Sequence, residues 1–474
     1  MERMRGIDAG YLYMETPTVH MHTLKIGVLD TSEAPGGYRF ERLVEEMERR
    51  LHLLPPFRRR IVAVPLGLHH PMWIEDPGFA IDNHIARERL PSPGTQEQLD
   101  DAVARIAGEP LRRDRPLWTL TVLEGLEGDR VAVVAKMHHA VADGVASVAM
   151  LANVATTTPE LLDPPPAPDW HAERIPSAAE LLRGAVRDWF RDLANFPSLL
   201  VDTVLRGAAL AQKRKSGDID AARPIVDAPR APFSGAPDAD RVFATIGLPF
   251  DELKAIRTTT GVSFNDVVMA VIDGAMVRWM KDQGHTMQRP LLAAVPVSAD
   301  EKGTIRLSGN RLSSLLTSLA TNVDDPQERL RRIAAAADQA KKVQSTLGAD
   351  LMERWVQFTP PGPFGVFMRL YSRLQLADRQ PPAVNMVISN VPGPREPLYI
   401  AGAKLVDFFS VGPVLEGMPL NITAWSYRDR MNFAILASPR TCTDIRSLAG
   451  YLKNSLDELA AAVREETSSA SEAN

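Results

Sequence analysis

The amino-acid sequence predicts an α/β protein. Segments typical of buried strands alternate with segments of helical spacing along both halves of the chain. Of 474 residues, 45% are apolar and 24% charged, which are ordinary values for a globular protein and exclude wholesale disorder or a fibrous chain. At about 150 residues per domain, the length fits two large domains or three smaller ones.

The first half begins with alternating elements. Short apolar or β-branched runs at 24–29, 118–123 and 131–137 predict strands, and the last two form a hairpin around the loop at 124–130. Apolar residues at helical spacing predict helices at 40–53, 100–108 and 141–155. We expect this domain to cover residues 1–162.

A proline-rich segment at 163–168 then interrupts the pattern and predicts a stiff linker. The helical segment that follows, 178–215, is expected to be interrupted near Pro197. It carries one apolar stripe, which either packs on the protein or lies in a membrane interface with Lys213, Arg214 and Lys215 near anionic headgroups. The residues of the stripe are Leu182, Val186, Trp189, Leu193, Phe196, Leu200 and Val204. A second linker closes this middle region, 163–240.

The second half, 241–466, again mixes strands and helices, and 467–474 is a polar tail. Strands are predicted at 241–248, 291–297, 384–390, 404–411, 420–427 and 431–436. Helices are predicted at 263–283, with Ser263 as the N-cap, and at 326–347 and 443–465. The prolines and glycine of 358–363 predict a turn or surface loop.

Charge and cysteine content narrow the function. The net charge of −5 offers no global attraction for nucleic acid, and the single cysteine, Cys442, excludes an internal disulfide and a Cys-rich metal site. We expect an intracellular protein with no secretory signal, whose contact with a membrane is peripheral because no run reaches about 18 apolar residues.

The sharpest chemical motif is the pair His138-His139, followed by Asp143 and Gly144, between a strand and a helix. Adjacent strand residues point in opposite directions, so one histidine faces a given site. The unperturbed pKa of a histidine side chain, about 6.5, suits a general base. A metal site formed by His138, His139 and Asp143 lacks a third well-placed ligand. The chain has no GxSxG, GxGxxG or GxxxxGK[ST] motif. The absence of these motifs predicts that the histidine base acts in a direct group transfer, without a covalent enzyme intermediate.

Five motifs together resemble the bacterial wax ester synthase/diacylglycerol acyltransferase family, within the chloramphenicol-acetyltransferase-like superfamily. They are HHAVADG at 138–144, PLW at 116–118, ND at 265–266, PVS at 296–298 and SNVPGP at 389–394. The segments 7–12 and 73–76 are also similar to the family. The resemblance implies two chloramphenicol-acetyltransferase-like domains with a tunnel at their interface, joined by a helical linker segment.

The resemblance also implies roles for residues. His139 accepts the proton of the acceptor hydroxyl, Asp143 holds the loop, and Gly144 leaves room for substrate. Asn265 is a candidate oxyanion donor and Asp266 a helix-start brace bordering the substrate. His138 belongs to the substrate-binding set. The ionic partner of Asp143 is open between Arg306 and Arg311, because Ala299-Asp300 stands where the family commonly has an arginine.

Two other motifs have alternative roles. Pro116, Leu117 and Trp118 either shape a substrate pocket or form a turn and core, and Ser389 and Asn390 either border the tunnel or form a structural turn.

The resemblance implies acyl-CoA as donor substrate and diacylglycerol or a long-chain alcohol as acceptor, with no bound cofactor and no nucleic-acid partner. Two alternatives are a condensation-type enzyme that uses carrier-protein thioesters and a catalytically silent lipid-droplet protein. We expect the chain in the cytoplasm, at the inner membrane surface or on lipid droplets.

Overall fold

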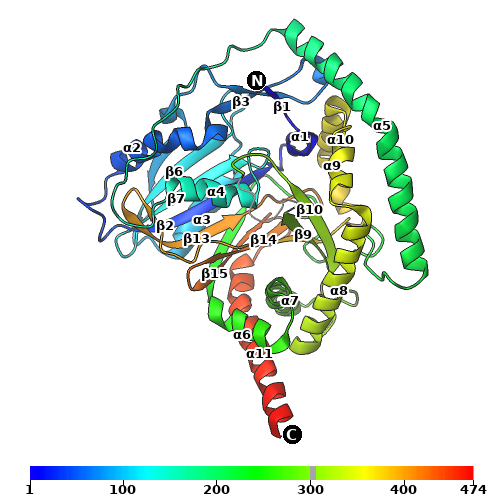
Figure 1. Ribbon diagram of the computed structural model, residues 1–474. Coiled ribbons are helices and arrows are strands. Elements are labelled where there is room, and N and C mark those ends of the chain that lie inside the picture. Colours follow the sequence, from blue (N-terminus) through cyan, green and yellow to red (C-terminus); the bar gives the residue numbers. More distant parts are fainter. Residues whose placement is uncertain (299–305, 473–474) are drawn as a thin grey trace.

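The computed structural model describes residues 1–298 and 306–472. Two six-stranded sheets form the centre, and helices surround them (Figure 1). A small three-stranded sheet lies beside the N-terminus and has the order β1-β4-β3. Its strands are β1 (Glu2–Arg3), β3 (Arg59–Val62) and β4 (Met72–Glu75). The predicted α/β class is confirmed.

The first large sheet has the strand order β12-β13-β2-β7-β6-β5. Its strands are β2 (His22–Asp30), β5 (Ile85–Arg89), β6 (Trp118–Leu126), β7 (Arg130–His138), β12 (Tyr399–Ile400) and β13 (Ala403–Val411). β6 and β7 pair antiparallel, as the predicted hairpin requires. One face packs on α2 (Phe40–Arg50) and α4 (Gly144–Val154), and the other on α3 (Gln96–Gly108).

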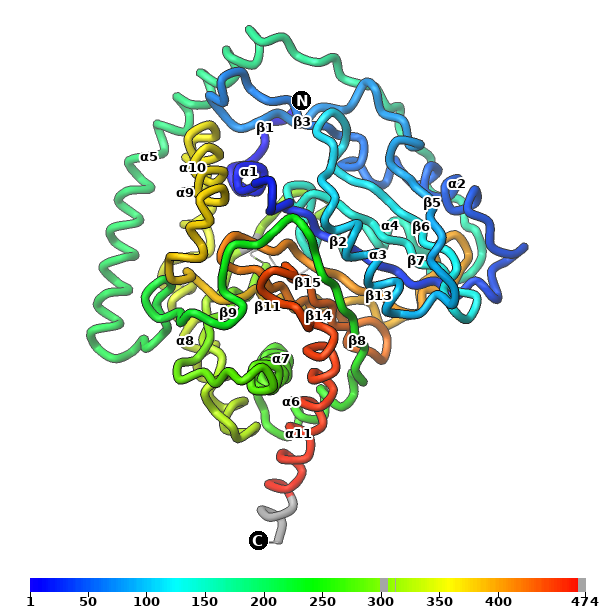
Figure 2. The backbone as a smooth tube through the Cα atoms, turned by 180° about the vertical axis from the view of Figure 1, so that it is seen from behind, coloured from blue at the N-terminus to red at the C-terminus, as the bar shows by residue number. Residues whose placement is uncertain are grey.

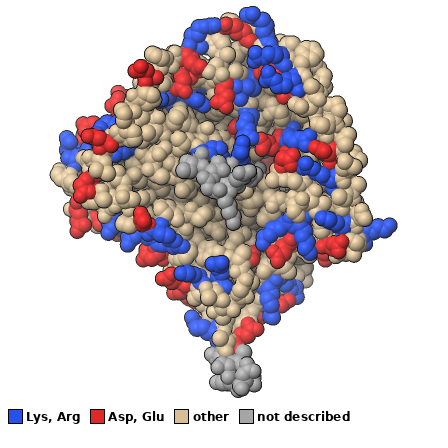
Figure 3. All heavy atoms as spheres, viewed as in Figure 1, with Lys and Arg blue, Asp and Glu red and all other residues tan. Residues whose placement is uncertain are grey.

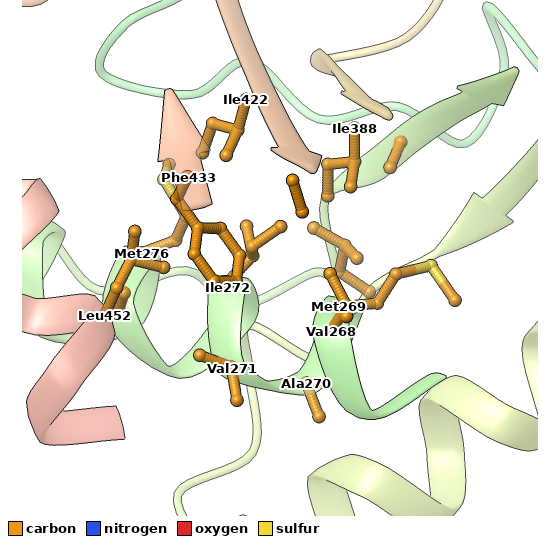
Figure 4. Packing of buried hydrophobic residues seen from close by; sticks show 14 of the residues in the cluster. Val268, Met269, Ala270, Val271, Ile272, Met276, Ile388, Ile422, Phe433 and Leu452 are labelled. Atoms are coloured by element: carbon orange, nitrogen blue, oxygen red, sulfur yellow. The ribbon is translucent and has the colours of Figure 1, made fainter. Parts of the chain in front are cut away.

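The second large sheet has the order β10-β9-β11-β14-β15-β8. Its strands are β8 (Val242–Pro249), β9 (Leu292–Ser298), β10 (Leu312–Ser318), β11 (Met386–Val391), β14 (Leu420–Tyr427) and β15 (Arg430–Ala437). Helix α7 (Phe264–Asp282) runs beneath it, and Ile272 and Met276 point toward Ile422 and Phe433 of the sheet (Figure 4). α6 (Phe250–Thr260), α8 (Pro326–Leu347) and α11 (Ile445–Glu472) enclose α7.

The C-terminal half of the chain contributes two strands, β12 and β13, to the first sheet. β13 comes from the C-terminal half, yet it pairs antiparallel with β2 of the first sheet, Phe408 opposite Gly27. The predicted domain boundaries at 162 and 240 therefore do not separate the two sheets, because β12 and β13 of the predicted C-terminal domain belong to the first sheet. Helix α11 also continues through most of the predicted tail, to Glu472. These strands hold the two sheets side by side, and the motif 138–144 lies where the sheets meet, with Gly144 against Val391 of β11.

Helix α5 (Ala178–Lys215) follows the predicted linker and runs along the outside of the molecule (Figure 2). The predicted interruption at Pro197 is wrong, because the helix continues through it. Contacts directly after Pro197 support the helix: Arg354 of α9 (Asp350–Val356) pairs with Asp202, and the Trp355 indole donates to Thr203 at 2.9 Å.

The remaining helices are short. They are α1 (Gly6–Tyr13), α10 (Pro361–Arg373) and the 3₁₀ turns η1 (Leu51–Leu53), η2 (Pro55–Arg58), η3 (Pro65–Gly67), η4 (Ile81–Asn83) and η5 (Leu376–Asp378). Within the described ranges, no single helix has the length and apolarity to cross a membrane; α6 and α7 reach that threshold only together, bent by 112°.

Candidate active site

The motif 138–144 forms a loop between β7 and α4. β7 ends at His138, and Asp143 is the N-cap of α4, where its side chain accepts the N–H of Ala146 at 3.0 Å. Gly144 begins the helix against the end of β11. A Cβ atom there would lie 3.2 Å from a methyl group of Val391, closer than ordinary packing allows. The loop is thus held between elements of both sheets.

His139 is oriented by Asn310. The imidazole Nδ1 lies 3.0 Å from the amide oxygen of Asn310, while the amide nitrogen donates to Asp8 at 2.7 Å and to the His139 carbonyl at 2.8 Å. Because both amide protons face acceptors, the oxygen must accept, and Nδ1 carries the proton. The Nε2 atom therefore keeps the lone pair that a general base requires.

The surroundings of His139 favour its neutral form. The ring stacks on Tyr11, with 4.3 Å between ring centroids. Burial lowers the pKa of His139 below its ordinary value, and the positive charge of Lys25 acts in the same direction. A neutral imidazole at neutral pH follows. Burial also raises the pKa of the supporting Asp8 to about 6.

Both carboxylate oxygens of Asp143 accept hydrogen bonds that hold the loop in place. Its Oδ2 accepts from the Arg306 guanidinium at 2.6 Å and from the backbone N–H of Arg311 at 3.1 Å, while Oδ1 caps α4. The charged partner of this carboxylate is Arg306, and Arg311 contributes a backbone bond. Ala299 and Asp300 lie outside the described residues. This geometry braces the loop.

His138 points away from the base. Its Nδ1 accepts the N–H of Ala140 at 3.0 Å, so Nε2 donates to Glu15 at 3.0 Å, and Glu15 also pairs with Arg113. The side chain is fully buried. Both nitrogens are occupied within the protein, and substrate binding by His138 stays a prediction.

The ND pair begins α7. Asp266 and Ser263 form a reciprocal capping box, with bonds of 3.0 and 3.2 Å. Asn265 is half-buried beside them, and within the described residues no hydrogen bond or ring contact joins it to His139. The structure therefore brings Asp266 into a bracing position, and the oxyanion role of Asn265 is untested.

The PLW triplet lies in the core of the first sheet. The Trp118 indole donates to the Phe57 carbonyl at 2.8 Å and stacks on Phe57 and His84. Leu117 is buried, and its carbonyl accepts the N–H of His138 at 2.9 Å, which ties the triplet to the catalytic strand. Pro116 makes the turn before it and accepts from the N–H of Trp118.

Ser389 and Asn390 lie half-buried near the end of β11. They face Thr423 and Ala424 of β14 across a parallel pairing, directly before Val391, whose side chain lies against Gly144. The motif is thus close in space to the loop at 138–144. Direct contact with a substrate stays a prediction.

Sequence reasoning missed Asn310, and it gave no role to Asp8 or Tyr11. Asn310 has no sequence signal, because its function arises from contacts with residues 171 and 302 positions away. Asp8 and Tyr11 belong to the quoted segment 7–12, which was the one available indication.

An apolar cavity begins directly behind the loop. It lies between the first sheet and the helices α2 and α4, and its wall contains Met137, two residues before His139, and Ser147, which donates to the Asp143 carbonyl at 2.7 Å. Further along it is lined by Met150, Leu151, Val154, Phe57, Leu120 and Phe408. It continues along α4, away from the histidine. Among the described residues, no cluster of His, Cys, Asp and Glu is arranged to hold a metal ion.

Comparisons with known proteins identify the family of the chain. The wax ester synthase/diacylglycerol acyltransferase catalytic-domain model matches residues 4–268, and the model of the family's C-terminal domain matches 308–460. A Mycobacterium tuberculosis protein named a diacylglycerol O-acyltransferase is 38% identical over 452 residues, covering 94% of this chain and 92% of that one. Another from the same organism is 36% identical and covers 98% of both chains.

Solved structures share the fold. The wax ester synthase/diacylglycerol acyltransferase of Marinobacter aquaeolei VT8 superposes with a TM-score of 0.69 at 24% identity, covering 98% of this chain and all of that one. The first condensation domain of the calcium-dependent antibiotic synthetase has a TM-score of 0.59 at 15% identity, over 97% and 95% of the chains. The chain is an acyltransferase that belongs to the wax ester synthase/diacylglycerol acyltransferase family.

Proposed function

We propose that the chain transfers a fatty acyl group from acyl-CoA to diacylglycerol, giving triacylglycerol, with long-chain alcohols as a second class of acceptor that gives wax esters. The observation that carries this proposal is the neutral His139, whose Nε2 keeps its lone pair and which follows two residues after Met137 in the wall of an apolar cavity. A histidine base whose hydrogen-bond partner is the amide of Asn310 suits direct transfer, and an apolar cavity suits a hydrocarbon chain.

In the proposed reaction His139 acts twice. Nε2 accepts the proton of the acceptor hydroxyl while that oxygen attacks the thioester carbonyl carbon. The carbonyl electron pair moves to oxygen and forms a tetrahedral oxyanion. When the carbonyl re-forms, the carbon–sulfur bond breaks, and the imidazolium returns the proton to the CoA thiolate. Asn310 holds the ring in the required tautomer throughout, and Asn265 is proposed to donate to the oxyanion.

An anionic donor is supported by a second hollow of about 350 Å³, which opens beside Ala140 and Val141 of the catalytic loop. Its wall contains Arg3, Arg5, Arg59, Arg306 and Arg311 against the carboxylates Glu2 and Asp8. Such a wall suits the phosphate groups of CoA.

Release of CoA tests the proposal. The purified protein is given palmitoyl-CoA with diacylglycerol, with hexadecanol, or with neither, and the same acyl group on a carrier protein forms the competing arm. We expect CoA release and ester only when an acceptor is present. Faster turnover of the carrier-bound thioester would favour a condensation-type enzyme, and turnover of neither donor would favour a silent lipid-droplet protein.

We further propose that the protein meets its lipid substrates at a membrane or droplet surface on the cytoplasmic side. Much of the predicted stripe of α5 faces outward: Trp189 is 52% and Val204 69% exposed, and Phe190 beside the stripe is 62% exposed. Phe196 of the stripe instead packs on Trp355 and Phe358. The turn η3 contacts both α5 and α10, and Leu66 in η3 and Leu68 directly after it are exposed. On α10 the exposed large apolar residues are Val366, Phe367 and Leu370, and Leu374 directly follows the helix. Figure 3 shows few charges along the right-hand edge, where α5 runs. We call these residues of α5, α10 and η3 the apolar surface.

A surface of this kind exceeds the scattered apolar residues normal for a protein exterior, and it suits lipid because neutral-lipid substrates do not dissolve in water. Lys213 and Arg214 of the predicted basic cluster donate to Thr346 and to the Ala221 carbonyl, so the apolar side chains carry the larger part of the proposed contact.

A further inference from the structure

The apolar cavity contains one charge that nothing in it balances. Three charged residues line it, and two of them, Glu46 and Arg50, form an ion pair with each other. The third is Lys25 on β2. Within the described part of the chain, no carboxylate lies within ion-pair distance of its ammonium group. A buried cation without a counter-ion is costly, so the site favours an anionic or partly negative ligand.

Lys25 is held at the end of the cavity closest to the catalytic loop. Its Nζ donates to the hydroxyls of Thr23 at 2.9 Å and Ser410 at 2.8 Å, and it lies 5.8 Å from the centroid of the Trp425 ring. An ammonium group has three donors, so one N–H is left after the two hydroxyls. The pairing of β13 with β2 creates this arrangement, because Ser410 lies on β13 opposite Lys25.

The reacting carbonyl must lie at the same end. If the acyl chain occupies the cavity along α4, its carbonyl carbon lies at the loop, within reach of the hydroxyl that His139 deprotonates. Lys25, Met137 and Ser147 line this end. The charges are close enough to influence each other: Lys25 contributes to the lowered pKa of His139, and Asp143 acts on Lys25, whose own pKa burial lowers to about 7.

We propose that the Lys25 ammonium donates its remaining hydrogen bond to the thioester oxygen and stabilises the oxyanion formed during acyl transfer. This inference rests on the proposed function. The carbonyl electrons move onto oxygen as the acceptor oxygen bonds to carbon, and they return as the carbon–sulfur bond breaks. In its ammonium form Lys25 transfers no proton in this step, and its positive charge lies beside the developing oxyanion, so it stabilises the transition state more than the bound substrate.

A buried lysine on the other face of the same sheet supplies the control. Lys136 lies on β7, and its Nζ donates to the carbonyls of Ile106 and Glu109, both at 2.8 Å, on the side of α3. Lys25→Met and Lys136→Met therefore remove the same buried charge from opposite faces of one sheet. The methionine keeps most of the side-chain volume.

The experiment measures kcat and KM for palmitoyl-CoA, the melting temperature, and the Kd of a palmityl-CoA thioether, which lacks the carbonyl. We expect Lys25→Met to lower kcat about 10²-fold, in the range seen when one oxyanion donor is lost, with the thioether Kd unchanged. Lys136→Met should keep kcat. A fall in melting temperature common to both variants does not affect the comparison, because kcat is measured on folded protein.

Three results would overturn the inference. They are an unchanged kcat in Lys25→Met, an equal loss of kcat in Lys136→Met, or weaker thioether binding that accounts for the whole loss. Inhibition by free palmitate that disappears in Lys25→Met while kcat is normal would instead make Lys25 a carboxylate anchor. Wild-type protein that releases no CoA would contradict the proposed function itself, before any variant is compared.

Discussion

The amide oxygen of Asn310 lies 3.0 Å from Nδ1 of His139, and the same amide donates to the carbonyl of that histidine at 2.8 Å. A residue 171 positions away in the chain thus fixes both the ring and the backbone of the proposed base. The second amide proton goes to Asp8, so α1 supports the pair.

Asn310→Ala should therefore act through the tautomer of His139. Without the acceptor, Nδ1–H has no fixed partner, and the ring populates the tautomer whose Nε2 carries the proton and cannot act as base. We expect kcat to fall about 10²-fold, the lower end of the contribution of general-base catalysis. Steady-state kinetics and the ¹⁵N shifts of His139 measure the two effects. A reduced kcat with an unchanged tautomer would contradict this explanation.

The pH profile of kcat/KM should reflect the lowered pKa of His139. The active form is the neutral imidazole, which exists above the pKa, so activity should persist at pH 6.5 and decline only at lower pH. Lys25 lowers this pKa and Asp143 raises it, so Lys25→Met should move the acid limb toward higher pH. An acid limb centred above 6.5 in the wild type would contradict a buried neutral base.

Asn265 and Asp266 provide a matched pair of substitutions at the start of α7. Asp266→Ala removes one side of the capping box and should lower stability by about 1 kcal/mol with little effect on kcat. Asn265→Ala leaves that box intact, so it tests the oxyanion role: we expect kcat to fall about 10²-fold at an unchanged melting temperature. A normal kcat in Asn265→Ala would remove this residue from the catalytic set.

The apolar surface should govern binding to lipid. Replacing Trp189, Phe190, Phe367 and Leu370 with serine should weaken retention on phosphatidylcholine vesicles that contain diacylglycerol, because each side chain is at least half exposed and loses its burial in lipid. Leu162→Ser is the control, since this residue is 55% exposed beside α2 and outside the apolar surface. Sedimentation with vesicles measures retention. Equal retention of both variants would leave the surface without a lipid role.

Local patterns predicted much of the fold. The β6–β7 hairpin, the Ser263 cap and the helix 326–347 follow from alternation, helical spacing and capping residues, and all are confirmed. The predicted loop at 358–363 is wrong in its second half, where α10 begins at Pro361. Proline is tolerated at the first helical position because no N–H is needed there.

Local sequence patterns do not predict which distant segments of the chain come into contact. The pairing of β13 with β2 places Ser410 beside Lys25, and no local feature of either strand indicates the partner. Asn310 is likewise an ordinary polar residue in sequence, and only the fold places it against His139. The motif 138–144 predicted where the base lies, while its orientation depends on α1 and on the segment before β10.

The central claim is that His139 is the base of a direct transfer. The most direct test compares CoA release by wild-type protein and His139→Ala, with palmitoyl-CoA and diacylglycerol and with binding of palmitoyl-CoA measured separately. We predict that the variant binds palmitoyl-CoA with unchanged Kd, releases CoA about 10²–10⁴-fold more slowly, and carries no acyl group on the protein. Near-normal release by folded His139→Ala, or an acylated protein during wild-type turnover, would contradict the claim.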